Sequence, residues 1–318
     1  MILSKGVKNM KKCPLFGICG GCQFDFPSPT YRTQKLSQLP KIKFTDDPIW
    51  GTPGARRRAD FGFVDGHFGF YKTKTKDIID ITNCPNLVEE INAVLPNISA
   101  LPWRGAGSVL ITKCENGIDV GVASNVPYFS ADFKSAVDKL PASIIRFTWN
   151  DKTERQYGEP EIKFDEKIVK YPPHAFLQPT METERDLRNL VIKYVDGASR
   201  VADLFCGLGN FTFATNATGF DVFGNGITRD LFKKPLTVQN LNQYDVVIMD
   251  PPRAGAMAQS KEIAKSKVVR VIYVSCNPTS FVRDADILMR GGYEMTTAIP
   301  VDQFVGSSHW EIFSVFQK

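Results

Sequence analysis

Short runs of hydrophobic residues alternate with polar residues through the first half of the chain. The runs Phe61–Val64 and His67–Tyr71 flank the dipeptide Asp-Gly, which commonly closes a two-residue β-hairpin. The runs Val109–Thr112 and Ile118–Val122 flank a second short polar segment that contains Asn-Gly. This half of the chain therefore predicts antiparallel β-structure with a few helices.

The pattern changes after residue 173, where hydrophobic residues take up helical spacing behind Thr180. Short hydrophobic strands are then expected at Val201–Phe205, Asp245–Met249 and Val268–Ser275, and a helix at Phe281–Arg290. Strands that alternate with helices are typical of a mostly parallel sheet covered by helices. The second half therefore predicts an α/β domain.

Length and composition agree with two folded domains, a β-rich one over residues 1–172 and an α/β one over residues 173–318. Hydrophobic residues make up 43% of the 318 residues, so both halves can build a core. No hydrophobic run approaches the roughly 18 residues of a membrane span. The first residues also lack the hydrophobic core of a signal peptide. These features predict a cytoplasmic protein with no membrane partner, whose seven cysteines stay reduced.

Positive charge is concentrated at the front of the chain. Residues 1–90 contain fourteen Lys and Arg against nine Asp and Glu, so the net charge of +5 arises there. Arg56–Arg58 and the lysines at positions 72, 74 and 76 suggest phosphate contacts. Aromatic residues of the same hairpin suggest stacking on nucleobases, namely Phe61, Phe63, Phe68, Phe70 and Tyr71. An ordinary hairpin with charged edges would carry the same residues, so both interpretations stay open.

A polar motif follows each of the three expected strands: Asp203–Asn210, Asp250–Arg253 and Tyr273–Pro278. Ligands of parallel sheets bind beyond the carboxyl ends of the strands, so these motifs mark the expected site. The glycines of the first motif let the backbone approach a ligand, and the helix start behind them favours a carboxylate. A dinucleotide fingerprint would need a third glycine, which residues 211–213 do not supply. The motif predicts a cofactor of another kind, although a plain tight turn would use the same glycines.

Cys276 is the candidate nucleophile, because it ends a strand at this edge and a thiolate attacks electrophilic carbon atoms. Free cysteine has a pKa of about 8.5, so local activation of this thiol is expected. Most cysteines are instead buried and inert, which is the competing interpretation. Glu311 lies among hydrophobic residues of the final strand, where partial burial would raise its pKa, and it is the candidate base.

Four cysteines form a separate pattern, with Cys13, Cys19 and Cys22 near the front of the chain and Cys84 before a proline. Their close spacing and the glycines between them let one backbone loop wrap a metal centre. Iron–sulfur and zinc both suit four thiolates, and unligated thiols are the third possibility. The five-residue gap and the Cys-Pro ending favour a [4Fe–4S] cluster.

Taken in order, these motifs resemble the RNA uracil-5-methyltransferases that act on 23S rRNA and tRNA. The resemblance rests on the cysteine motif, the basic hairpin, residues 176–180, the three strand-end motifs and His309–Glu311. It implies a Rossmann-like class I methyltransferase domain behind an iron–sulfur, β-rich domain. It also implies S-adenosylmethionine as cofactor and methylation of C5 of a uridine in RNA, with 23S rRNA as the first choice. The N-terminal TRAM barrel of the family is not expected here.

The resemblance further implies a role for each candidate residue. Uracil C5 is a weak nucleophile, so Cys276 would add at C6 to activate it, and Glu311 would later remove the C5 proton. The positions that hold S-adenosylmethionine in the family correspond to Gln178, Phe205, Asn210, Asp230 and Asp250. Those that hold the cluster correspond to Cys13, Cys19, Cys22 and Cys84.

The chain also departs from the family pattern. Thr180 replaces an asparagine, and Phe281–Asp284 replaces Leu-Ala-Arg-Asp. The largest departure follows an expected strand at Asp221–Gly224, because the next strand-like residues begin at Ile227. Parallel neighbours need a crossover of about a dozen residues. We therefore predict a deletion of a crossover helix and one strand, a tight turn or hairpin closed by Asn225-Gly226, and no carboxylate at the ribose position.

Two other functions stay open at this point. Asp-Pro-Pro sequences also occur in methyltransferases that act on amino groups of nucleobases, and that reaction needs no thiol. An iron–sulfur RNA-binding protein whose cofactor site has decayed through the deletion would carry the same cysteines.

Overall fold

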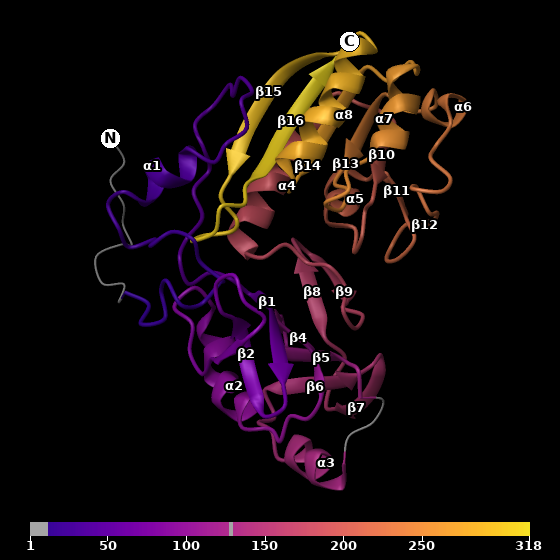
Figure 1. Cartoon of the computed structure of the whole chain (residues 1–318). Helices are drawn as coiled ribbons and strands as arrows, with labels where there is room; N and C mark the ends of the chain where they lie inside the picture. Colours follow the sequence, from indigo (N-terminus) through magenta and orange to yellow (C-terminus); the bar gives the residue numbers. More distant parts are fainter. Residues whose placement is uncertain (1–11, 127–129) are drawn as a thin grey trace. The chain divides into compact units, whose positions relative to one another are not determined.

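The computed structural model describes residues 12–126 and 130–318 (Figure 1). This part of the chain folds into two compact units. The first unit contains the described residues up to Ser37, Thr52–Met181 and Val305–Ser308. The second unit contains Gln38–Gly51, Glu182–Phe304 and His309–Lys318. Because each unit draws on three segments, no single cut in the sequence separates them.

A seven-stranded sheet forms the centre of the first unit, in the order β3-β2-β1-β4-β5-β6-β7. Its strands are β1 (Arg58–Val64), β2 (His67–Tyr71), β3 (Ile78–Asp80), β4 (Ala106–Cys114), β5 (Gly117–Ser124), β6 (Ile144–Trp149) and β7 (Lys152–Gln156). Neighbours are antiparallel except β5 and β6. The predicted hairpins are confirmed as β1–β2 and β4–β5. A further hairpin joins β8 (Glu161–Phe164) to β9 (Lys167–Lys170).

Helices and aromatic side chains complete the core of this unit. Helix α2 (Glu89–Ser99) buries Ile91, Val94, Leu95 and Ile98, which share one face at helical spacing. The shorter helices are α1 (Tyr31–Leu36) and α3 (Ala131–Asp138), and the Ser130 hydroxyl caps α3 by accepting from Phe133 N.

The aromatic residues of the first hairpin belong to this core. Phe61, Phe63 and Phe68 are at most 1% exposed, and the ring of Phe63 lies 4.6 Å from that of Trp103. Alternate residues of a strand face the same side, so these rings point together into the interior. Of the two interpretations left open, stacking on nucleobases is therefore excluded for these three rings. Tyr71, at 48% exposure, is the hairpin aromatic that faces solvent.

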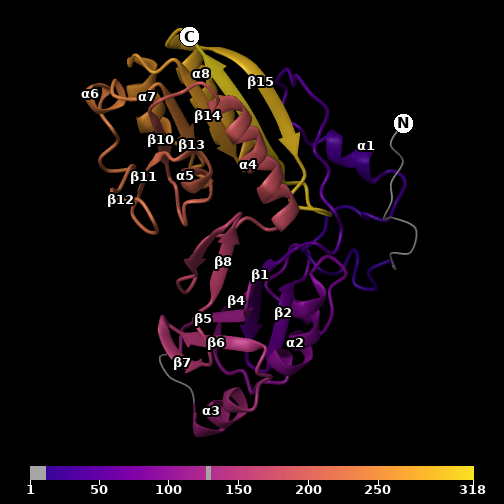
Figure 2. The same cartoon turned by 180° about the vertical axis from the view of Figure 1, so that it is seen from behind.

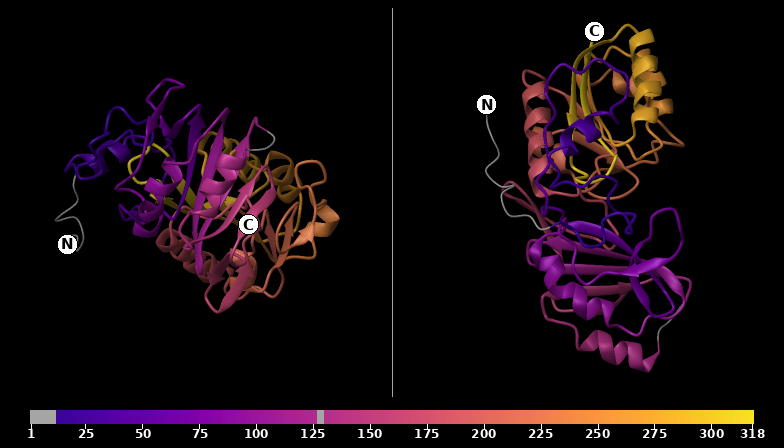
Figure 3. Two further views of the ribbon diagram at one scale, coloured as in Figure 1. Left: turned by 90° about the horizontal axis from the view of Figure 1, so that it is seen from below. Right: turned by 60° about the vertical axis from the view of Figure 1, so that its left-hand side comes forward.

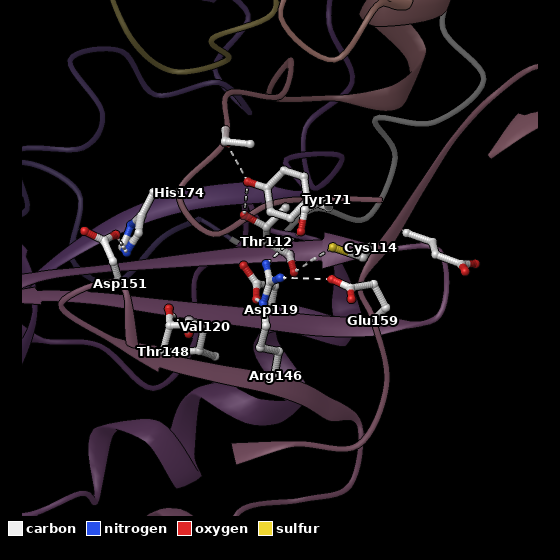
Figure 4. A network of polar contacts seen from close by, with 12 residues as sticks. Thr112, Cys114, Asp119, Val120, Arg146, Thr148, Asp151, Glu159, Tyr171 and His174 are labelled. Atoms are coloured by element: carbon white, nitrogen blue, oxygen red, sulfur yellow. Dashed lines mark hydrogen bonds and ion pairs between the residues drawn. The ribbon is translucent and has the colours of Figure 1, made fainter. Parts of the chain in front are cut away.

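A buried polar network fixes the chain that follows β9 against the sheet (Figure 4). Arg146 donates through Nε to Asp119 Oδ1 at 2.6 Å and through Nη2 to Tyr171 O at 2.8 Å. The Tyr171 hydroxyl donates to Ala175 O at 2.6 Å and lies 3.2 Å from Thr112 Oγ1. Burial raises the pKa of Asp119 even beside Arg146. Removing one partner of such a pair costs about 3–5 kcal/mol, because the other charge is left uncompensated.

The second unit is built on another seven-stranded sheet, in the order β12-β11-β10-β13-β14-β16-β15. Its strands are β10 (Val201–Leu204), β11 (Thr218–Asp221), β12 (Ile227–Thr228), β13 (Val246–Met249), β14 (Arg270–Ser275), β15 (Glu294–Val301) and β16 (Glu311–Gln317). The first five strands of the order pair in parallel, whereas β16 is antiparallel to both β14 and β15. The predicted mostly parallel α/β sheet is confirmed.

Helices cover both faces of this sheet, because successive strand residues point to opposite sides. Val246 and Ile248 pack with residues of α4 (Met181–Val195) and α5 (Asn210–Thr215). Val247 and Met249 pack with the other three helices, α6 (Val238–Leu241), α7 (Met257–Ala264) and α8 (Pro278–Arg290). The right-hand view of Figure 3 shows α4 and α8 on opposite sides of the strands, and Figure 2 shows α4 from its own side. Of the helices described, none is long and apolar enough to cross a bilayer.

Residues 38–51 belong to the second unit although they precede the first sheet in sequence. Thr45 N donates to Ala298 O and Ile49 N donates to Pro300 O, both at 2.9 Å. Asp302 N donates back to Ile49 O at 2.8 Å. The segment therefore covers the outer edge of β15, which would otherwise present unpaired backbone groups.

The tetrapeptide Val305–Ser308 belongs to the first unit although it connects β15 to β16. Gly306 O accepts from Gln23 N at 2.7 Å, and Val305 O accepts from Asn86 Nδ2 at 2.7 Å. Both donors lie within two residues of a cysteine of the four-cysteine motif.

The connection between β11 and β12 is unusually short for parallel neighbours. Phe220 pairs with Ile227 in parallel, with no helix in the described residues between the strands. The predicted loss of the crossover helix is confirmed, but the predicted loss of a strand and the hairpin at Asn225 are wrong. A two-residue strand is only about 7 Å long. The connecting loop can span about 17 Å, so it returns without a helix.

Candidate active site

The strand register brings Cys276 and Glu311 to the same edge of the second unit's sheet. Ser275 ends β14 and pairs with Ile312 of the antiparallel strand β16. Cys276 follows Ser275 and Glu311 precedes Ile312, so both side chains start from one end of this strand pair. Asp250 follows the parallel strand β13, which also ends there. The three candidate side chains therefore start from the ends of three neighbouring strands.

The surroundings of Cys276 raise the pKa of its thiol to about 12. Burial is the main cause, followed by the negative charges of Glu311 and Asp250, and Arg253 opposes them. The surroundings of Cys276 therefore favour the neutral thiol, whereas the sequence analysis expected activation. The same charges show that the sulfur lies within electrostatic reach of both carboxylates.

Glu311 is only 2% exposed, and burial together with the charge of Asp250 raises its pKa well above the ordinary value. The predicted burial and raised pKa are confirmed. Gln303 donates from Nε2 to Glu311 Oε2 at 2.5 Å, which favours the ionised carboxylate. The sequence analysis missed Gln303, because a glutamine eight residues away on another segment carries no recognisable motif.

A glycine-rich turn follows β10, at the next strand end along the sheet. Phe205 has a φ of +63°, and Gly207 and Gly209 also adopt positive φ angles. A non-glycine residue in this region is strained and marks a turn that the surroundings hold in place. Asn210 begins α5, and its Oδ1 accepts from Arg188 Nη1 at 3.4 Å. The Phe205 ring lies 5.4 Å from that of Phe232.

Two carboxylates flank this turn, and only one of them was predicted. Asp230 accepts from Phe232 N and Lys233 N through Oδ1, so it mainly holds its own turn. Asp221 ends β11 and accepts from Gly207 N at 2.9 Å. A carboxylate thus lies at the carboxyl end of β11, where the sequence analysis expected none. That expectation failed because the strand was predicted to begin at residue 221, whereas β11 ends there.

Gln178, the fifth predicted cofactor residue, lies in the first unit and is 5% exposed. Its backbone oxygen accepts from Arg57 Nε at 3.2 Å, and Arg57 N donates to Pro179 O at 2.8 Å. Arg57 is itself only 2% exposed. It is therefore not part of an exposed phosphate-binding patch, and instead holds the segment that carries Gln178.

The four cysteines of the motif line one cavity of about 60 Å³ in the first unit: Cys13, Cys19, Cys22 and Cys84. Burial raises the pKa of Cys22 to about 12 and that of Cys84 to about 11, and neighbouring thiols add to both shifts. Gly20 is required here, because a Cβ on it would lie 2.9 Å from Tyr71 O.

The same thiols do not converge on one point. Across residues 12–126 and 130–318, no group of three or more His, Cys, Asp or Glu side chains is arranged to hold a metal ion. The guanidinium of Arg56 also lines the cavity, and the thiols of Cys84 and Cys22 influence its pKa. A buried cation beside several thiols suits a group of net negative charge.

The strand order of the second unit, its glycine-rich turn and the carboxylates at its strand ends define a class I, S-adenosylmethionine-dependent methyltransferase fold. A crystal structure of the Pyrococcus abyssi tRNA (uracil-54, C5)-methyltransferase with S-adenosyl-L-homocysteine has this fold. It matches with a TM-score of 0.69 at 19% identity, over 89% of this chain and 81% of that one.

Sequence relatives identify the family. An uncharacterized RNA methyltransferase of Caulobacter vibrioides is 31% identical over 96% of this chain and 85% of its own length. The 23S rRNA (uracil(1939)-C(5))-methyltransferase RlmD of Salmonella typhimurium is 29% identical over 98% of this chain and 82% of its own length. The family described as tRNA (Uracil-5-)-methyltransferase matches residues 232–318. The chain belongs to the RNA uracil-5-methyltransferase family.

The alignment with the Caulobacter protein also bears on the length of this chain. It extends over 355 positions, more than the 318 residues of this chain. The relative therefore contains segments that have no counterpart here, in agreement with an internally shortened chain.

Proposed function

We propose that this protein transfers a methyl group from S-adenosylmethionine to C5 of a uridine in 23S rRNA. The single observation that carries the proposal is the placement of Cys276 and Glu311 at one sheet edge beside Asp250. Methylation at C5 needs a thiol beside a buried carboxyl group. Methylation of an amino group needs no thiol.

The proposed reaction has three steps. The Cys276 thiolate adds to C6, and the electrons of the C5=C6 bond make C5 nucleophilic. C5 then takes the methyl group, and S-adenosylhomocysteine leaves. Glu311 finally removes the C5 proton, the C5=C6 bond forms again, and the C6–S bond breaks to release Cys276. The target base must leave the stack for the sulfur to reach C6.

We assign the cofactor to the strand ends of the second unit. The contact predicted for Gln178, a residue of the first unit, stays a prediction. Phe205, Asn210, Asp230 and Asp250 are the predicted contacts, and Asp221 is added as acceptor for the ribose hydroxyls. When bound, the cofactor would supply a methyl group carried on a positively charged sulfonium sulfur. That charge would offset the two carboxylates that hold the Cys276 pKa high.

Asp221→Asn is expected to weaken S-adenosylmethionine binding about tenfold, since one charged hydrogen bond is worth about 1.5–3 kcal/mol. Isothermal titration calorimetry measures this directly. Asp196→Asn, which changes an exposed carboxylate after α4, is the matched control. An unchanged dissociation constant in Asp221→Asn would remove Asp221 from the cofactor site.

We also propose that the four thiols hold a [4Fe–4S] cluster. A single zinc ion needs all four sulfur atoms about 2.3 Å from one point. A cluster distributes its ligands over four iron atoms, so it suits thiols that line a cavity without converging. The cavity also presents the cation of Arg56 to the net negative charge that such a cluster carries with four thiolates.

Purified protein is expected to contain about four iron and four sulfide ions per chain. Cys84→Ser should lose most of both and its visible absorbance, whereas Cys114→Ser, a buried thiol outside the cavity, should keep them. Elemental analysis checks this, and one zinc per chain after anaerobic purification would contradict the cluster.

The choice of 23S rRNA rests on the 29% identical Salmonella enzyme and on the cysteine motif. The test is mass mapping of 5-methyluridine in rRNA and tRNA from cells with and without the gene. Loss of one rRNA site is expected. Loss of a tRNA site instead would show that the substrate is tRNA and not rRNA. No change in either RNA would reject the proposed function.

A further inference from the structure

Two buried neutral side chains hold Glu311 from one side. Gln303 donates to Glu311 Oε2 at 2.5 Å, and the Thr183 hydroxyl donates to Gln303 Oε1 at 3.3 Å. All three side chains are at most 2% exposed. Thr183 lies in α4 and Gln303 just after β15, so two elements of the second unit build this chain of hydrogen bonds.

The two oxygens of Glu311 differ as a result. Oε2 accepts from Gln303, whereas Oε1 is buried and has no hydrogen-bond partner among the described residues. A buried carboxylate oxygen without a partner is costly and calls for an explanation. An oxygen that must receive a proton during the reaction has to be unoccupied beforehand.

We propose that Thr183 and Gln303 are positioning residues that occupy Oε2, so that Oε1 of Glu311 takes the C5 proton. The inference rests on the proposed function and deepens it. A hydroxyl facing a carboxamide oxygen donates to it, which turns the amide NH2 of Gln303 toward Glu311. The electrons of the C5–H bond re-form C5=C6, the C6–S bond breaks, and Cys276 leaves as the thiolate.

Gln303 opposes every other influence on the Glu311 carboxyl group. Burial and the charge of Asp250 raise the pKa of Glu311, while the Gln303 hydrogen bond lowers it. Cys276 also interacts electrostatically with Glu311, and Arg253 acts on that thiol. Arg253 Nη2 lies 3.4 Å from His309 Nε2. Without Gln303, a larger share of Glu311 would be protonated and unable to act as a base.

Gln303→Met keeps the length of the side chain and removes the donor. In single-turnover reactions with unmodified rRNA, the covalent protein–RNA complex should form at the wild-type rate. Release of the RNA from this complex should be roughly tenfold to hundredfold slower near neutral pH. That factor corresponds to the free energy of one hydrogen bond to a charged group. Because the pKa of Glu311 rises when the donor is lost, the pH profile of release should move to higher pH.

Thr183 supplies a second, independent variant should Gln303→Met fold poorly. Thr183→Val keeps the shape and removes the hydroxyl, so the Gln303 amide can flip and release should slow. Thr183→Ser keeps the hydroxyl and should restore the wild-type rate and pH profile. A purely structural role would reduce the formation and release of the complex alike and would leave the pH profile in place.

Glu311→Gln, run in parallel, separates two kinds of failure. If Glu311→Gln traps the complex but Gln303→Met and Thr183→Val release it at the wild-type rate at every pH, the positioning role is overturned and the proposed function stands. If Glu311→Gln traps no complex, the proposed base itself is wrong.

Discussion

Cys276→Ala is expected to abolish both methyl transfer to uridine and the covalent complex with 5-fluorouridine RNA. The thiol is the one group that makes C5 nucleophilic in the proposed reaction, so no partial route remains. The loss should be on the order of 10⁴-fold or more, as when other enzymes lose their nucleophile. Transfer of a radioactive methyl group from S-adenosylmethionine to rRNA measures the rate, and a denaturing gel detects the complex.

The matched control is Cys114→Ala, which removes a buried thiol of the first unit that lies outside both sites. It should methylate at the wild-type rate. Retained methyl transfer in Cys276→Ala would show that the acceptor is an amino group, since that chemistry needs no adduct. Retained RNA binding with no transfer in the wild-type protein would indicate a decayed cofactor site.

Glu311→Gln is expected to separate the first half of the reaction from the second. The amide matches the carboxylate in shape, so Cys276 should still add and the methyl group should still be transferred. Release needs a base, and its loss should slow turnover about 10²–10⁴-fold. The protein should therefore accumulate a methylated covalent complex on ordinary, unfluorinated RNA.

The complex is measured as radioactive methyl groups that stay with the protein in detergent. Wild-type protein should show almost none after one turnover. If Glu311→Gln instead releases free methylated RNA at the normal rate, the base is another group, and Asp250, whose charge acts on Glu311, is the next candidate. Removal of the Glu311 carboxylate should also change the pKa of Cys276. The Cys276 pKa should fall, because one of the charges that raise it is gone.

Much of the fold follows from local sequence pattern. The hairpin at β1–β2 and strands β10, β13 and β14 were predicted because each is a hydrophobic run bounded by turn residues. The prediction for β11 failed because glycine and polar residues break its run on both sides. The predicted strand began at Asp221, whereas β11 ends there. This shift of three residues moves the Asp221 carboxylate from the start of the strand to its ligand-facing end, so its position was mispredicted.

The candidate site was predictable only where a motif marked it. Cys276 and Asp250 each end a strand, so the topology rule places them together. Glu311 lies beside them because of the register between β14 and the antiparallel strand β16. A run of hydrophobic residues does not specify that register, so the sequence did not predict this proximity. Gln303 and Arg57 carried no signal, because their importance lies in buried contacts with residues distant in sequence.

The tetrapeptide Val305–Ser308 makes the two units inseparable along the sequence, because it belongs to the first unit while the segments on both sides of it belong to the second. Its backbone oxygens are held by residues adjacent to the cysteine cavity, while the helices and strands on either side belong to the methyltransferase sheet. A fragment starting at Glu182 would lack the donors Gln23 and Asn86. It would also lack residues 38–51, which cover the outer edge of β15. That fragment should therefore not fold stably on its own, even though it contains every strand of its sheet.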